Sequence, residues 1–191
     1  MLDRARERLG GSPNVAFAVE DGQDLSFPDE SFDAVPCNMG LMYFPNPVRG
    51  LSEFRRVLRP GGRAAVSVFT RADRALVGGL VRRAIARHVP SKAAEAERFF
   101  SLGDEPRLRA HFEVAGFGEV EIATETLAFR FPSFDAYFGG VERGEGARGQ
   151  EYMALTEEER RTVREEVRRE VGDEGGPIEV EVKVRIASGR R

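Results

Sequence analysis

The feature that most constrains the fold is a compact strand–helix–strand pattern between residues 32 and 69. Residues 32–37 form a short run of apolar and aromatic side chains, which is typical of a strand. Asn46 and Pro47 predict a helix start, because Asn caps free backbone N–H groups and Pro fits the first helical turn. Residues 63–69 predict a second strand. A strand, a helix and a strand in so short a span indicate parallel pairing with a right-handed crossover.

The helix inside this unit has clear boundaries. Leu51, Phe54 and Leu58 recur at helical spacing and predict a buried stripe. Pro60 predicts the helix end, because its ring disfavours helical geometry at the preceding residue. The two glycines that follow predict a turn into the next strand.

Further elements are predicted on both sides of this unit. Along the chain they are a helix over residues 2–9, a strand over residues 14–20, a helical region over residues 73–116, a long strand over residues 120–131, a flexible loop over residues 143–150 and a helix that opens with a capping box at Thr156. Residues 178–186 alternate strictly between apolar and charged side chains. That alternation predicts one buried face and antiparallel pairing near a sheet edge.

Composition excludes several classes of protein. The chain has 191 residues, which is the size of one domain. Its 29 Lys and Arg against 32 Asp and Glu give a formal net charge of −3, which argues against a nucleic-acid partner. No apolar run is long enough to span a membrane, and the charged start is unlike a signal peptide, so a cytoplasmic protein is expected. A single cysteine, Cys37, excludes an internal disulfide and a cysteine-cluster metal site, and no metal is expected.

Three residues are candidates for ligand binding, because ligands of open parallel sheets lie outside the carboxyl ends of the strands. Asp21 offers a carboxylate acceptor, and Gly22 beside it lets a flat ring approach the backbone. Asn38 follows the next strand and offers an amide. The alternative interpretation is purely structural, with Asp and Gly starting a turn and Asn ending a strand.

Residues 14–69 also carry a series of motifs in a characteristic order. In chain order these are Glu20-Asp21-Gly22, Leu25-Ser26-Phe27, Ser31-Phe32-Asp33 and Arg56-Val57-Leu58-Arg59-Pro60-Gly61-Gly62. This order resembles the second half of a class I S-adenosylmethionine-dependent methyltransferase domain of the ubiquinone-biosynthesis-like type. Ser26 replaces the usual proline of that family, and Gly22 the commoner alanine.

The resemblance implies an α/β fold with a Rossmann-like sheet, a helical insertion and an antiparallel C-terminal strand pair. It implies S-adenosylmethionine as the cofactor. Asp21 would then accept a hydrogen bond from the adenine amino group, the Gly22 N–H would meet a ring nitrogen, and Asn38 would line the methionine portion. Residues 1–71 would form the remaining cofactor side, residues 72–116 a helical segment, and residues 117–191 the C-terminal strands and helix, all within one partial domain.

The same resemblance implies a missing front part. The family's glycine-rich loop, its first two strands and the acidic residue that holds the ribose hydroxyls are not found in this sequence. Met1 is therefore interpreted as an internal methionine of a longer, N-terminally truncated chain, with cofactor binding impaired by the loss. Binding of S-adenosylmethionine tighter than millimolar is not expected.

The expected function of the complete protein is methyl transfer to a small-molecule acceptor, for which no catalytic residue is identified. Two alternatives remain: a non-catalytic remnant or partner-dependent α/β fragment, and a nicotinamide-dependent oxidoreductase.

Four other side chains have open roles. His88 and His111 are helix-surface or packing residues, or general bases in an acceptor pocket, and Tyr43 and Phe44 either floor that pocket or pack in the core. Cys37 is expected to be a small apolar side chain rather than a nucleophile.

Overall fold

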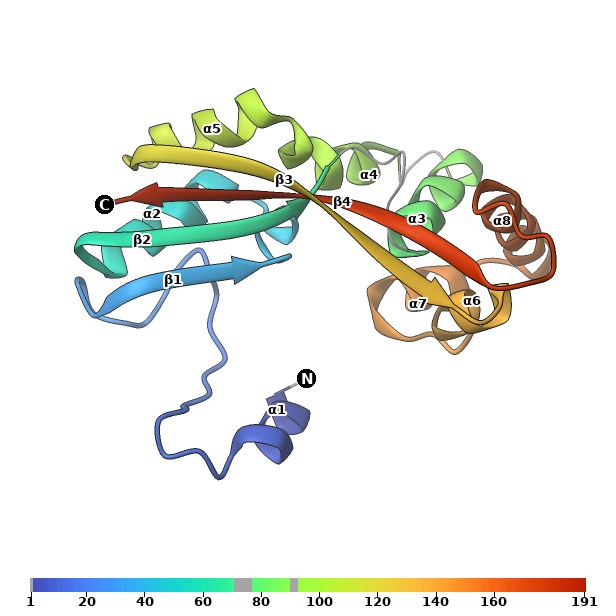
Figure 1. The fold of residues 1–191 in the computed structure, drawn as a ribbon, viewed down its shortest axis with the longest axis horizontal. Helices are drawn as coiled ribbons and strands as arrows, with labels where there is room; N and C mark the ends of the chain where they lie inside the picture. Colours follow the sequence, from blue (N-terminus) through green and yellow to red (C-terminus); the bar gives the residue numbers. More distant parts are fainter. Residues whose placement is uncertain (1, 71–76, 90–92) are drawn as a thin grey trace.

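The computed structural model describes residues 2–70, 77–89 and 93–191, in which four strands form one open, twisted sheet with helices packed against it (Figure 1). The strand order is β1 (Phe32–Asn38), β2 (Leu58–Phe69), β4 (Ile178–Arg190) and β3 (Gly118–Phe131). β1 and β2 are parallel, whereas β4 is antiparallel to both of its neighbours. The mixed α/β class and the antiparallel C-terminal strand pair are therefore confirmed.

Helices connect and cover these strands. They are α1 (Leu2–Leu9), the short η1 (Leu41–Tyr43), α2 (Pro47–Val57), α3 (Val77–His88), α4 (Ala93–Phe100), the short η4 (Ser101–Gly103), α5 (Glu105–Val114), α6 (Phe134–Glu142), α7 (Gly146–Met153) and α8 (Glu157–Glu170). The predicted start of the helical region at residue 73 lies outside the described residues. Among the described residues, no helix has the length and apolar character needed to cross a membrane.

The predicted starts of α2 and α8 are confirmed by their caps, whereas α2 ends at Val57, before the predicted end at Pro60. The Asn46 side chain accepts a hydrogen bond from the Arg49 N–H at 3.1 Å, and Pro47 occupies the first turn of α2. Thr156 and Glu159 form the predicted reciprocal capping box of α8. These caps satisfy backbone N–H groups that have no partner inside the helix.

The junction between α2 and β2 is tighter than predicted. The strand begins at Leu58, directly after the helix, and the two glycines lie inside it as a bulge. Against β1, the register steps two residues, from Phe32 to Ala34, while β2 steps five, from Leu58 to Arg63. The glycines themselves have backbone partners: the Gly61 N–H donates to the Arg191 carbonyl at 3.2 Å, and the Arg191 N–H donates to the Gly62 carbonyl at 2.9 Å.

The strand predicted over residues 14–20 is wrong. Asn14 lies in a turn, residues 15–20 form no strand, and Val19 is 84% exposed. In Figure 1 this segment and α1 lie apart from the sheet. Apolar, β-branched residues favour a strand only where a neighbouring strand supplies hydrogen bonds, and none of the described strands lies beside this segment.

One further prediction is confirmed and another needs correction. β4 has the predicted alternation and the predicted antiparallel pairing near a sheet edge, since it lies next to the edge strand β3. The second half of the loop predicted over residues 143–150 is helical, as the start of α7. Buried Tyr152 anchors this helix with its ring against Phe138 at a centroid distance of 5.4 Å.

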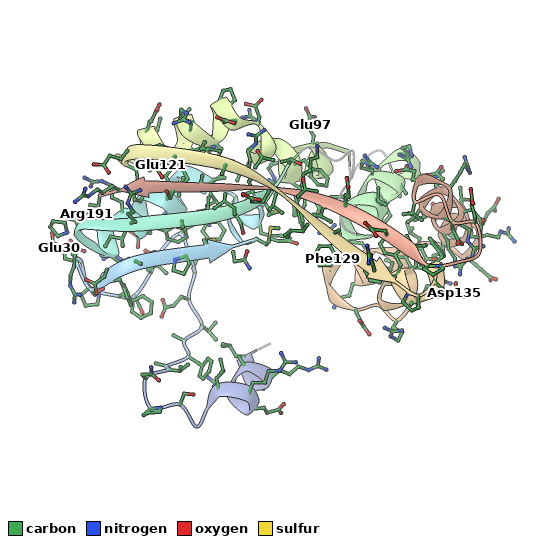
Figure 2. The ribbon with its side chains drawn as sticks, in the orientation of Figure 1. Glu30, Glu97, Glu121, Phe129, Asp135 and Arg191 are labelled. Atoms are coloured by element: carbon green, nitrogen blue, oxygen red, sulfur yellow. The ribbon has the colours of Figure 1, made fainter. Side chains whose placement is uncertain are left out.

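Two hydrophobic cores lie along the long strands. The first joins β1, β2, α2 and α5, and the second joins the start of β4 with α3, α6, α7 and α8. Met39 and Phe69 pack against both cores. Arg191 forms an ion pair with Glu30 at 2.8 Å, and both lie at the same end of the sheet (Figure 2).

Candidate functional site

The predicted site residues Asp21 and Gly22 form a tight turn before α2. The Asp21 carboxylate accepts a hydrogen bond from the Gln23 N–H at 2.9 Å. The backbone carbonyl of Asp21 accepts another from the Asp24 N–H at 2.9 Å. Within the described chain, the Gly22 N–H and the second carboxylate oxygen of Asp21 make no hydrogen bond. An acceptor and a donor on adjacent residues therefore remain available to a ligand.

Gly22 is fixed by packing as well as by the turn. A Cβ added to it would lie 2.2 Å from Cζ of Phe44, and a Cβ on Gly50 would lie 2.4 Å from Cδ2 of the same ring. The Phe44 ring is thus wedged between two glycines, one before α2 and one inside it. This contact explains why the position holds glycine instead of alanine, and it answers the open question about Phe44, which packs here.

The turn is also attached to α2 by Gln23. The Gln23 side-chain oxygen accepts from the Asn46 N–H at 2.8 Å, and its carbonyl accepts from the Arg49 Nε at 2.7 Å. The start of α2 is therefore both capped by Asn46 and hydrogen-bonded to the turn that contains Gln23. The sequence offered no signal for Gln23, because a lone glutamine has no fixed structural preference.

A carboxylate–guanidinium pair holds the next stretch of chain on α2. Glu53 accepts from the Leu25 N–H at 2.9 Å and from Arg56, whose guanidinium also donates to the carbonyls of Leu25 and Phe27. The hydrogen bond from Arg56 lowers the pKa of the Glu53 carboxyl below its ordinary value, against the opposing effect of burial. Residues 21–27 are thus bound along one helix face.

The third predicted residue, Asn38, ends β1. Its side-chain oxygen accepts from the Ser67 hydroxyl at 2.5 Å, and that hydroxyl oxygen accepts from the Met39 N–H at 3.0 Å. Met39 has φ +52°, a left-handed conformation that is uncommon for a methionine. Held backbone strain of this kind concentrates at functional sites. Neither Ser67 nor Met39 was predicted, since methionine and serine carry no sequence signal for such geometry.

The three predicted residues border one short segment. Asn38 precedes residues 39–44 directly, and Gly22 packs on Phe44 at the end of that segment. Cys37, just before it, is half-buried, and burial raises the pKa of its thiol, which keeps the thiol protonated and a poor nucleophile. Among the described residues, no group of three or more His, Cys, Asp or Glu side chains could hold a metal ion.

An aromatic cluster follows on the other side of the same segment. Tyr43 is 58% exposed and meets Phe99 edge to face at a centroid distance of 5.1 Å. The guanidinium of Arg82, which is buried, lies 4.2 Å from the Phe99 centroid, and that of Arg148 lies 6.0 Å from it. Phe99, Arg82 and Arg148 come from elements far apart in the sequence, so their meeting was not predictable.

The two histidines occupy different environments. His88 contacts Glu166 at 2.9 Å between α3 and α8, which is the helix-surface role. His111, on α5, faces a cavity between α4, α5 and the start of α2.

Comparison with known proteins relates the chain to methyltransferases. A methyltransferase domain family matches residues 1–66. A demethylmenaquinone methyltransferase from Clavibacter sepedonicus is 36% identical over 132 residues, which cover 63% of this chain and 54% of that protein. A ubiquinone/menaquinone biosynthesis C-methyltransferase from Saccharophagus degradans is 29% identical over 135 residues, with the same coverage of 63% and 54%. The chain thus spans about half the length of these curated relatives.

A solved structure shares the fold. The protein from Bacillus halodurans C-125, assigned as a methyltransferase, superposes with a TM-score of 0.62 at 19% identity, and the match covers 99% of this chain and 78% of that one.

Proposed function

Since the chain belongs to the class I S-adenosylmethionine-dependent methyltransferases, we propose that the protein transfers a methyl group from that cofactor to a ring carbon of a quinol-type acceptor. The reaction type and acceptor are those in the names of its demethylmenaquinone and ubiquinone/menaquinone relatives. The activity is proposed for the whole protein, because the aligned residues span about half of each relative.

The observation that carries the proposal is that Asn38 and Gly22 border the same segment, residues 39–44, at the carboxyl end of β1. Asp21 and Gly22 present a free acceptor beside a free donor, the pattern that the amino group and ring nitrogen of adenine require. Asn38, oriented by Ser67, would meet the methionine portion. The residues at this end of the sheet therefore fit the adenine side of the cofactor.

The bound cofactor supplies an electrophilic methyl group, so the protein's part is alignment and exclusion of water. The Gly22–Phe44 contact fixes the position of the Asp21–Gly22 turn relative to α2. The hydrogen bond between Ser67 and Asn38 fixes the orientation of the Asn38 side-chain amide. A ring carbon accepts a methyl group more readily when its hydroxyl is deprotonated. We place the acceptor ring beside Tyr43 and Phe99, where the guanidinium group of Arg82 would stabilise that anion, whereas the guanidinium group of Arg148 is already paired with Glu151.

The test is transfer of labelled methyl from S-adenosylmethionine to a reduced demethylmenaquinone, measured with cofactor at millimolar concentration. Asp21→Ala and Asn38→Ala are expected to lower kcat/KM for the cofactor by about tenfold or more each, since each loses a hydrogen-bonding group. Matched controls are Asp24→Ala, in the same turn, and Asn14→Ala, which is exposed.

Label in the quinol ring with both controls near wild type supports the proposal. Absence of transfer to any quinol would favour the alternative, a partner-dependent α/β unit without catalysis of its own. One observation favours that alternative: among the described strands, β1 pairs only with β2 and leaves its other edge open.

A further inference from the structure

A cavity on the helical side of the first core lies apart from Asp21 and Asn38. Its volume is about 220 Å³. One wall is apolar, with Met42 from η1, Phe44 and Pro45 from the link to α2, Pro47 from the first turn of α2 and Leu102 from η4. The volume is below the roughly 300–1,000 Å³ typical of drug-sized ligands, so a smaller molecule fits.

The other wall is basic. Arg98 at the end of α4 and Arg107 and His111 on α5 all line the cavity. No acidic residue is among its lining residues. Glu97, next to Arg98, is exposed and projects outward from α4 (Figure 2).

The two arginines differ from their neighbours in having no acidic partner. Among the described residues, neither Arg98 nor Arg107 forms a side-chain hydrogen bond or ion pair, whereas Arg109 and Arg185 both pair with Glu105. Two like charges that line one cavity repel each other, and an anion between them removes that repulsion. This wall of the cavity therefore carries positive charge that no acidic side chain of the described residues balances by an ion pair.

Local hydrogen bonds fix the backbone at the two arginines, which are both exposed residues. The Asp104 side chain accepts from the Arg107 N–H at 3.0 Å and caps α5. The Ser101 hydroxyl donates to the Arg98 carbonyl at 2.7 Å and closes the end of α4. That hydroxyl hydrogen is already used, so the donors toward a ligand are the two guanidinium groups and the imidazole.

We propose that this cavity binds a small phosphate monoester with an apolar body. Two guanidinium forks and an imidazole offer more donors than the two oxygens of a carboxylate accept, whereas a phosphate monoester has three terminal oxygens and a charge of about −1.5 to −2 at neutral pH. The apolar part of the ligand would lie on Met42 and Leu102, both of which are buried. The cavity shares Phe44 with the packing around Gly22, but Arg98, Arg107 and His111 have no part in the proposed methyl transfer, so loss of phosphate binding in an arginine variant is distinguishable from failure of that transfer.

The experiment titrates the chain with phenyl phosphate by calorimetry and compares two double variants of equal charge. Arg98→Gln/Arg107→Gln removes both guanidinium groups of the cavity. Arg161→Gln/Arg169→Gln removes two exposed arginines of α8 and is the control for net charge. The first variant is expected to weaken binding by about tenfold or more, and the control by less than about twofold.

The apolar wall gives a second readout. Phenyl phosphate is expected to bind more tightly than inorganic phosphate, and Leu102→Ala is expected to reduce that preference. Equal loss in both double variants, or no saturable binding of phenyl phosphate, would overturn the proposal.

A lipid headgroup is the other source of the same chemistry. Vesicles that contain phosphatidic acid, compared with phosphatidylcholine vesicles, separate the two sources. Binding of phenyl phosphate without selective vesicle binding supports a dissolved ligand. Binding to phosphatidic acid vesicles that is lost in the cavity variant, with no binding of phenyl phosphate, would contradict it.

Discussion

At the residue scale, Gly22 shows how one missing side chain positions a candidate binding group. Its backbone could bear a methyl group in most turns, but here Phe44 occupies the space that the Cβ would need. The same ring fills the space above Gly50, so turn, ring and helix form one packed unit. The role expected for Gly22 uses only its N–H, and packing keeps that N–H in place.

Gly22→Ala is therefore expected to lower the free energy of unfolding by about 1–3 kcal/mol, the usual cost of overpacking. Urea denaturation measures it. Gly11→Ala is the control, because nothing lies within 4 Å of a Cβ at that position. Phe44→Leu in the Gly22→Ala background should recover part of the loss. Equal stability of Gly22→Ala and Gly11→Ala would show that the wedge does not exist.

At the element scale, α2 organises the candidate site. Its cap, its first turn and its face each hold part of residues 21–27. The Glu53–Arg56 pair is central to this attachment, since both partners also bind the backbone of the attached segment.

This attachment predicts a pH dependence. The pKa of Glu53 is lower in the folded chain than its ordinary value of 4.5, so its stabilising effect is present above that value and is lost as the pH falls through the lower folded pKa. Glu53→Gln is expected to lower stability at neutral pH, and its difference from wild type is expected to shrink in acid. The measurement is urea unfolding between pH 3 and pH 7, about the range in which carboxyls titrate.

Glu125→Gln is the matched control, because Glu125 is exposed on β3 and shows no comparable attachment. A constant difference between Glu53→Gln and wild type over the whole pH range would contradict the assigned role of the pair.

The elements also show what the sequence could and could not predict. Asn46-Pro47 and Thr156 predicted helix starts, because capping depends on a few adjacent residues. Pro36 cannot donate a ladder hydrogen bond, which fits its place in β1, a strand with one open edge among the described strands. The strand predicted over residues 14–20 failed because a strand needs a neighbouring strand, and that neighbour is distant in sequence and leaves no local signal.

At the scale of the whole molecule, two cores share the long strands β3 and β4 (Figure 1). Met39 touches both cores and directly follows Asn38, so the strained end of β1 lies where they meet. The candidate residues Asp21, Gly22 and Asn38 could be selected from motif order and strand ends. Their partners Phe44, Gln23 and Ser67, which set the geometry, could not, because ordinary packing residues carry no motif.

The most direct measurement is a titration of the chain with S-adenosylhomocysteine, followed by backbone and side-chain amide chemical shifts in NMR. The account predicts saturable changes at the Gly22 N–H and the Asn38 side-chain amide, with one shared affinity in the millimolar range. Changes confined to other regions, or saturation with both of these amides unmoved, would contradict the claim that this end of β1 receives the adenine side of the cofactor.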